Sequence, residues 1–222
     1  MQEPLAVIFD MDGVLVDSYR AHFESWRQMA ATLGRELTEA KFVKTFGRIS
    51  REIIAEHWGA GVMTDDEIAV FDRQKEALYR EIVAADFPAM PGAAELLRAL
   101  HAGGFRLAIG SSGPPANVAL AVERLDAGEL FQALVTGADV TRGKPDPQVF
   151  LTAARRLGLP PARCAVVEDA PVGIAAANAA GMASIALLST GHTADSVQDA
   201  RLIVESLAEL TPSRIAGLIE LR

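Results

Sequence analysis

The fold is decided by the stretch Val7-Ile8-Phe9-Asp10-Met11-Asp12-Gly13-Val14-Leu15-Val16-Asp17-Ser18, close to the start of the chain. The apolar run from Leu5 to Phe9 has the length and β-branched character of a strand that is buried on both faces. It stops at two acids, Asp10 and Asp12. Because an unpaired buried carboxylate is costly, acids at this point predict a strand end that opens onto solvent, a cation, or both.

The spacing of these two acids suits two chemical roles. One carboxylate can coordinate a hard cation and attack an electrophile, while the other residue offers its backbone carbonyl to the same ion and its side chain to proton transfer. Gly13 allows a tight turn directly afterwards. An acidic turn that caps the next helix would show the same spacing, so this motif alone leaves both interpretations open.

Length and charge limit the possible functions. With 222 residues the chain can bury a large core, and a net charge of −8 disfavours nucleic acid or an anionic membrane as the main partner. An acidic protein can still bind phosphate through a metal and a few local cations. The single cysteine, Cys164, has apolar neighbours and is expected to be a buried structural residue. The first acids precede any apolar segment long enough for a signal peptide or a membrane span, so we expect a cytoplasmic protein.

Two regions with different patterns follow the first strand. Residues 17–85 predict helices only: one capped by Asp17 or Ser18 and ending near Leu33, one capped by Thr38, one after a break at Gly47, and one from Asp65 to Val83. We therefore expect residues 17–85 to form an inserted helical domain, and residues 1–16 and 86–222 to form the core domain.

The core region alternates between helix and strand. After the prolines and glycine of residues 87–92, the predicted strands are 105–110, 133–136, 164–167 and 183–188, and the predicted helices are 93–102, 117–125, 147–157 and 172–180. The strands are mostly apolar without alternation. This pattern predicts an α/β fold in which a parallel sheet is covered by helices on both faces.

Functional groups in such a sheet collect at the carboxyl ends of the strands. The residues that follow the predicted strands are Asp10 and Asp12, then Ser111 and Ser112, then Lys144, and finally Glu168 and Asp169. Taken singly, the serines and the late acids are also compatible with helix caps and the lysine with a solvated loop. Together they supply what phosphoryl transfer needs at one edge of the sheet.

In that reaction Asp10 attacks a phosphate ester, and a cation must neutralise the repulsion between the two anions. Mg²⁺ prefers oxygen ligands, which Asp10, the backbone carbonyl of Asp12 and Asp169 would provide. Lys144 would stabilise the phosphoryl oxygens and hold Asp10, and the Ser111 hydroxyl with nearby backbone N–H groups would bind the remaining oxygens. Asp12 would serve as general acid and then as general base.

These motifs, in this order, resemble the four motifs of the haloacid dehalogenase superfamily: Asp10-Met11-Asp12-Gly13-Val14, the strand end at Ser111, Gly143-Lys144-Pro145-Asp146-Pro147, and Glu168-Asp169-Ala170-Pro171-Val172-Gly173-Ile174. The resemblance covers essentially the whole chain. It implies a Rossmann-like core and a helical cap inserted after the first strand, as in subfamily I with a C1 cap. It also implies that Ser111, Ser112 and Lys144 bind phosphate and that Glu168 and Asp169 hold Mg²⁺. The dehalogenases lack the second acid of the first motif, so Asp12 favours phosphoester chemistry.

The cap is expected to choose the leaving group. The side chains that we single out there are His22, Trp26, Arg48, Arg51 and Lys75, although Trp26 also fits a core position of the cap and His22 an ordinary helix face. The pattern His22-Phe23-x-x-Trp26 with Gly47-x-x-x-Arg51 is similar to β-phosphoglucomutases and to hexose-phosphate phosphatases of the same subgroup. Arg51 would suit the second phosphate of a bisphosphate intermediate, as a mutase requires.

Pro114 and Pro115 favour the phosphatases, because the mutases usually carry a Lys-Asn pair directly after the serines. The resemblance thus predicts a Mg²⁺-dependent phosphatase of small phosphorylated metabolites, either sugar phosphates or acidic substrates such as phosphoglycolate. A phosphohexomutase is the alternative enzyme, and a phosphate-binding protein without turnover is the alternative from another class. We expect no nucleic-acid or membrane partner, and a monomer or weak homodimer.

Overall fold

The computed structural model describes residues 4–46 and 48–221, so the predicted break at Gly47 lies outside the described residues. The chain divides into two compact units. The core unit comprises Met1–Asp17 and Pro88–Arg222, and the helical unit comprises Ser18–Phe87. Each unit is described separately below.

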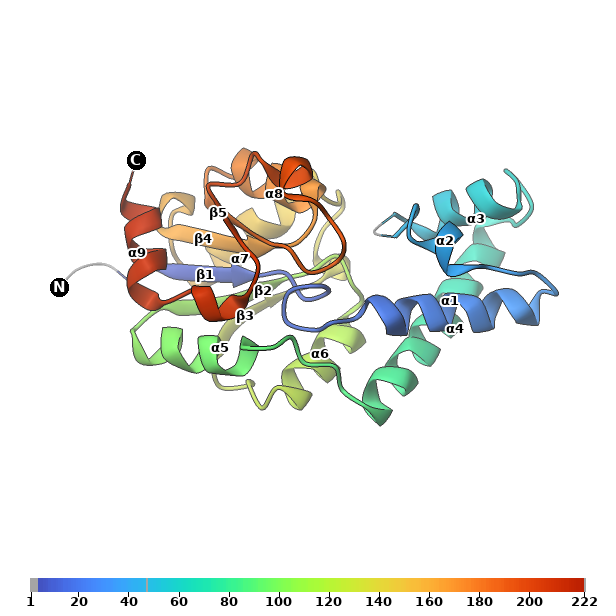
Figure 1. Ribbon diagram of the computed structural model, residues 1–222, viewed down its shortest axis with the longest axis horizontal. Helices are drawn as coiled ribbons and strands as arrows, with labels where there is room; N and C mark the ends of the chain where they lie inside the picture. Colours follow the sequence, from blue (N-terminus) through green and yellow to red (C-terminus); the bar gives the residue numbers. More distant parts are fainter. Residues whose placement is uncertain (1–3, 47, 222) are drawn as a thin grey trace. The chain divides into compact units, whose positions relative to one another are not determined.

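The core unit is built on a parallel sheet. Within the described residues it has six strands in the order β3-β2-β1-β4-β5-β6 (Figure 1). Their bounds are Ala6–Phe9 (β1), Arg106–Gly110 (β2), Phe131–Val135 (β3), Cys164–Glu168 (β4), Ala183–Leu187 (β5) and Leu202–Val204 (β6). All five strand pairs are parallel. The predicted parallel α/β fold is therefore confirmed.

The register places β1 in the middle of this sheet. Phe9, its last residue, is paired with Ile109 of β2 on one side and with Val167 of β4 on the other. The backbone N–H of Asp10 then donates to the Val167 carbonyl at 2.9 Å. The carboxyl ends of the three central strands thus lie at one edge of the sheet, as expected for parallel strands of similar length.

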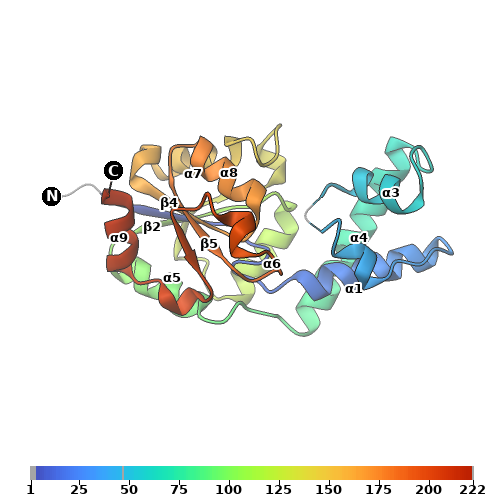
Figure 2. The same cartoon turned by 45° about the horizontal axis from the view of Figure 1, so that its top comes forward.

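Helices cover both faces of the sheet. Side chains alternate between faces along a strand, and one alternate set, which includes Ile8, Ala108 and Val166, forms an apolar cluster with α7 (Gln148–Leu157) and α8 (Pro171–Ala179). Figure 2 shows α7 and α8 together on one side of the sheet and α5 (Ala93–Ala102) on the other. Strands β1 and β4 are therefore buried throughout, which is why their residues are apolar apart from Glu168 at the end of β4.

Several helix boundaries differ from the sequence prediction. Helix α6 (Pro115–Arg124) begins two residues before the predicted Asn117, since proline is well tolerated in the first turn. Pro147 is the N-cap of α7 rather than its first residue, and the Asp146 side chain accepts the N–H of Gln148 at 3.0 Å. Within the described residues, none of the helices combines the length and the apolar character that crossing a membrane requires.

The last third of the core unit contains elements that sequence reasoning missed. Strand β6 and helix α9 (Pro212–Glu220) follow β5, together with the 3₁₀ turns η3 (Ala194–Val197) and η4 (Leu207–Glu209). Helix α9 packs near β4 and the preceding turn η2 (Pro161–Arg163). The missed strand has only three residues, too few for a periodic pattern to be recognised.

The helical unit contains α1 (Tyr19–Thr32), α2 (Glu39–Phe42), α3 (Ser50–Trp58) and α4 (Asp65–Ala85). Helix α4 starts with a capping box, in which Thr64 accepts from the Glu67 N–H and Glu67 accepts from the Thr64 N–H. Ser18 and Thr38 occupy the predicted N-cap positions, but neither side chain makes a capping hydrogen bond. Aromatic and aliphatic side chains from all four helices form the core of this unit.

We expect Leu107→Ala to lower the free energy of unfolding by about 2–5 kcal/mol, because Leu107 in β2 is fully buried and its loss leaves a cavity. The matched change Leu134→Ala in the edge strand β3, where 37% of the residue's surface is exposed, should cost less than about 1 kcal/mol. Urea denaturation of both variants measures the difference. Equal losses would contradict the assignment of Leu107 to the core.

Candidate active site

Carboxylates from two neighbouring strands meet at the carboxyl edge of the sheet. Asp10 directly follows β1, Glu168 is the last residue of β4, and Asp169 comes next. All three are buried, with 8%, 1% and 5% of their surface exposed. One oxygen of each carboxylate lies within 4.8 Å of the others. The β1–β4 pairing thus brings together residues that are about 160 positions apart in sequence.

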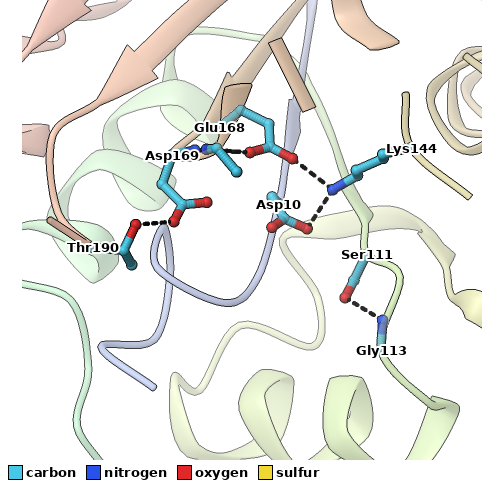
Figure 3. Close-up of polar contacts among 8 residues, drawn as sticks. Asp10, Ser111, Gly113, Lys144, Glu168, Asp169 and Thr190 are labelled. Carbon is cyan, nitrogen blue, oxygen red and sulfur yellow. Dashed lines mark hydrogen bonds and ion pairs between the residues drawn. The ribbon is translucent and has the colours of Figure 1, made fainter. Parts of the chain in front are cut away.

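Lys144 connects two of these acids. Its Nζ lies 2.8 Å from Asp10 Oδ1 and 2.7 Å from Glu168 Oε1 (Figure 3). The other oxygen of Glu168 accepts the backbone N–H groups of Asp169 and Ala170 at 2.8 and 2.9 Å. Glu168 is therefore held from both sides, and it fixes the ammonium group beside Asp10.

This site contains more negative than positive charge. Burial raises the pKa of Asp10 to about 7, although Lys144 opposes the shift. Burial and the nearby Glu168 and Asp10 also raise the pKa of Asp169 well above its usual value. For Lys144, burial disfavours the charged form, but the two carboxylates outweigh it and raise its pKa. The site thus has three buried carboxylates and one ammonium group. Carboxylate oxygens are hard ligands, so this arrangement fits a divalent cation.

Two glycines leave room for these carboxylates. A Cβ on Gly173, in the first turn of α8, would overlap the Glu168 carboxylate. A Cβ on Gly13 would overlap the Asp169 carboxylate, and the positive φ of 76° at Gly13 is itself unfavourable for other residues. Both motifs therefore need glycine at these positions for steric reasons.

The loop after β2 carries the predicted phosphate-binding serines. Ser111 is buried, and its hydroxyl accepts the N–H of Gly113 at 2.9 Å, a hydrogen bond that does not use the hydroxyl proton. Gly113 in turn accepts the Gly137 N–H at 2.9 Å. Ser112 is exposed, and Asp12 is half-buried with Oδ2 3.8 Å from the position that a Cβ on Gly113 would take. The loop thus lies near the second acid of the first motif.

Sequence reasoning missed Ser189 and Thr190, which follow β5. The Thr190 hydroxyl donates to Asp169 Oδ2 at 2.5 Å, and the Ser189 hydroxyl donates to the Gly13 carbonyl at 2.5 Å. The available signal was their position directly after a predicted strand, by the same rule that selected the other site residues.

Comparison with known proteins identifies the family. The model of the haloacid dehalogenase-like hydrolases matches residues 4–181. The chain belongs to this family. The resemblance stated from the motifs is therefore confirmed, together with the α/β core that it implies.

Relatives of this hydrolase cover nearly the whole chain. Hexitol phosphatase A of Escherichia coli strain K12 is 36% identical over 212 residues, which are 93% of both proteins. Validoxylamine A 7'-phosphate phosphatase of Streptomyces hygroscopicus subsp. limoneus is 33% identical over 208 residues, 91% of this chain and 94% of the relative. Beta-phosphoglucomutase of Bacillus subtilis strain 168 is 32% identical over 214 residues, 93% of this chain and 91% of the relative.

A solved structure gives the same result for the fold. The crystal structure of a HAD hydrolase, family IA, variant 3, from Entamoeba histolytica HM-1:IMSS superimposes with a TM-score of 0.87 and is 26% identical. The match covers 97% of this chain and 99% of that protein.

The helical unit of this hydrolase holds the other predicted residues, two of which are in contact. Lys75 Nζ lies 3.0 Å from His22 Nδ1 and 2.7 Å from Glu76 Oε1. An ammonium group can only donate, so Nδ1 of His22 is the acceptor. The His22 ring also stacks on Tyr79, with 4.1 Å between ring centroids. Lys75, with 5% of its surface exposed, is a buried cation supported by an acid and an imidazole.

The remaining residues singled out in this unit have different surroundings. Trp26 is buried and packs against Phe71, with 5.2 Å between ring centroids. Arg51 is exposed and pairs with Asp65 at 2.6 Å, while Arg48 lies 3.5 Å from Glu56. The structure therefore groups His22 with Lys75 and leaves the two arginines on separate surface ion pairs.

We expect a divalent cation, supplied as magnesium chloride, to raise the melting temperature more at about pH 8 than at about pH 5.5, because protons compete with the cation for the carboxylates. In the folded protein the pKa of Asp10 is about 7, whereas its ordinary value is 3.8. At a pH between these two pKa values, folding is therefore accompanied by uptake of a proton. The metal-free protein should accordingly lose stability as the pH rises from about 4 to about 7.

Thermal melts across this range, with and without magnesium chloride, measure both effects. Asp169→Asn is the control, since it should remove most of the cation-dependent rise. A rise that is equally large at all pH values, or that persists in the control, would contradict binding at this cluster.

Proposed function

We propose that this protein is a Mg²⁺-dependent phosphatase that hydrolyses small phosphorylated metabolites, sugar phosphates in the first place, through an aspartyl-phosphate intermediate. The observation that carries the proposal is the buried cluster of Asp10, Glu168 and Asp169 with Lys144 in contact. The names of two relatives, a hexitol phosphatase and a validoxylamine A 7'-phosphate phosphatase, support the substrate class.

Asp10 is the proposed nucleophile. Its carboxylate attacks phosphorus, the P–O bond to the leaving group breaks, and the phosphoryl group is transferred to Asp10. Lys144, 2.8 Å from Asp10 Oδ1, holds this carboxylate in one orientation and offers positive charge to the phosphoryl oxygens. Because Glu168 fixes the same ammonium group, the lysine stays in position as the phosphoryl group moves.

The residues proposed to hold Mg²⁺ are Asp10, Asp12 through its backbone carbonyl, and Asp169, with Glu168 beside them. When bound, the cation supplies positive charge that offsets the repulsion between the carboxylates and the phosphate.

Asp12 and the serines complete the proposed roles. Asp12 protonates the leaving alkoxide and then takes a proton from the water that hydrolyses the acyl phosphate. Its half-buried position gives it access to solvent between these two steps. Ser111, whose hydroxyl proton is not used by Gly113, donates to a phosphoryl oxygen, and the exposed Ser112 lies in the same loop.

The helical unit is proposed to be the cap that selects the leaving group. His22 and Lys75 form its buried polar pair, and Arg48 and Arg51 are exposed cations. Trp26 would act by holding α1 in place through its packing. We also keep the expectation of a cytoplasmic protein that acts as a monomer or weak homodimer.

We expect Asp10→Asn to reduce phosphate release from a panel of sugar phosphates by at least about 1,000-fold, because an amide oxygen is a poor nucleophile. The fold should persist, as the amide has the same shape. Asp126→Asn is the matched control, since Asp126 is exposed in a turn and asparagine tolerates its positive φ. If Asp10→Asn keeps more than about a tenth of the activity, the nucleophile is another residue. Phosphate binding by the wild type without turnover would instead favour a binding protein.

The second candidate function is that of a phosphohexomutase, favoured by the relative named beta-phosphoglucomutase. A mutase needs a cation for the second phosphate of its bisphosphate intermediate, and Arg51 was singled out for that role. Arg51 is engaged with Asp65 at 2.6 Å, and Pro114 and Pro115 lie where the mutases usually have Lys-Asn. Both observations favour the phosphatase.

Incubation with β-glucose 1-phosphate, Mg²⁺ and a trace of glucose 1,6-bisphosphate separates the two enzymes. We expect free phosphate to be released, with little glucose 6-phosphate, because nothing in the loop after Ser112 supplies the extra cation of the mutases. Coupled assays for the two products measure the ratio. Net conversion to glucose 6-phosphate without phosphate release would establish the mutase.

A further inference from the structure

The loop that follows β5 contacts two parts of the candidate active site. The Thr190 hydroxyl donates to Asp169 Oδ2, and the neighbouring Ser189 hydroxyl donates to the carbonyl of Gly13, each at 2.5 Å. Gly13 directly follows Asp12, and Asp169 directly follows Glu168. One pair of consecutive hydroxyl side chains therefore joins the first and the last motif of the site.

We propose that Thr190 is a positioning residue that fixes the carboxylate of Asp169 and thereby sets the affinity of the site for its divalent cation. The inference rests on the proposed function, because it assumes that Asp169 is a ligand of that cation. Thr190 itself touches neither the cation nor the substrate in this proposal.

The geometry at Asp169 supports this role. Figure 3 shows Thr190 on one side of the Asp169 carboxylate and Asp10 with Glu168 on the other. A carboxylate with one oxygen held by a hydroxyl cannot rotate freely, so its second oxygen stays on the side of the other acids. Without that hydrogen bond, repulsion from the two neighbouring carboxylates would favour rotation of Asp169 away from them.

Steric contacts lead to the same conclusion. A Cβ on Gly13 would overlap both the Asp169 carboxylate and the methyl carbon Cγ2 of Thr190. The three residues are thus packed closely, and the threonine methyl group occupies one side of the space in which the carboxylate would otherwise move. Ser189, the residue before Thr190, holds the Gly13 backbone in place through the hydrogen bond to its carbonyl.

Groups that orient metal ligands are expected to act on affinity more than on the chemical step. Loss of such a partner typically weakens metal binding by about 10–100-fold. A residue that only stabilised the fold would lower the melting temperature with and without the cation alike. The two cases therefore differ in their dependence on cation concentration.

The test compares Thr190→Val, which keeps the shape and removes the hydroxyl, with Thr190→Ser, which keeps the hydroxyl. The midpoint of the rise in melting temperature with magnesium chloride is measured without substrate. We expect this midpoint to increase by about 10-fold or more in the valine variant and to return to within about 3-fold of the wild type in the serine variant. The Mg²⁺ concentration for half-maximal phosphatase activity should move in parallel, with kcat largely recovered at saturating Mg²⁺.

Thr193→Val is the matched control, because Thr193 is exposed in the same loop and its side chain makes no capping hydrogen bond. A midpoint in Thr190→Val equal to that of the wild type, or one that the serine variant does not restore, would overturn this inference alone. A wild-type protein whose melting temperature does not respond to Mg²⁺ would overturn the proposed function and this inference together.

Discussion

Excess negative charge in a buried place is the constraint on which this site depends. Asp10, Glu168 and Asp169 lie within reach of one another beneath the surface, and Lys144 neutralises only part of their charge. Burial of unpaired charge is among the most costly arrangements in a protein, so the surrounding groups must reduce this cost. Two backbone N–H groups and the Thr190 hydroxyl do so, and a divalent cation would complete the balance.

The path of the backbone determines whether these carboxylates can lie close together. β1 occupies the centre of a parallel sheet, so Asp10 reaches the edge between the ends of β2 and β4. Glycine is then required wherever the chain passes close to a carboxylate, as at Gly13 and Gly173. Gly13 of the first motif thus makes room for Asp169 of the last motif, and Gly173 makes room for Glu168 within the last motif.

The dependence of the site on strand ends explains which of its residues could be predicted from the sequence. The residues at the ends of apolar strands are visible as acids, serines and a lysine after β-branched runs, and the parallel topology implies that they meet. Strand β6 was missed because its three residues give no periodicity. Helix α9 has nine residues, and its sequence signal, Thr211 as N-cap with Pro212 in the first turn, was not used. Thr190 was missed because a hydroxyl in a loop is common, and its function depends on a hydrogen bond to a residue 21 positions away. The absent capping bond at Ser18 likewise depends on local geometry.

The same reasoning bears on how substrates are distinguished within the family. The edge of the sheet carries groups suited to phosphate and a cation. Relatives that match almost the whole chain have names that refer to a hexitol, to validoxylamine A and to glucose. The proposed function therefore assigns selection of the leaving group to residues outside the strand ends. In this chain the helical unit offers a buried polar cluster, in which Lys75 is held by His22 and Glu76, and such a cluster is costly unless it serves recognition or stability. A buried ammonium with fixed partners presents its donors in one direction only, which is the property that the proposed role of the helical unit in selecting the leaving group requires.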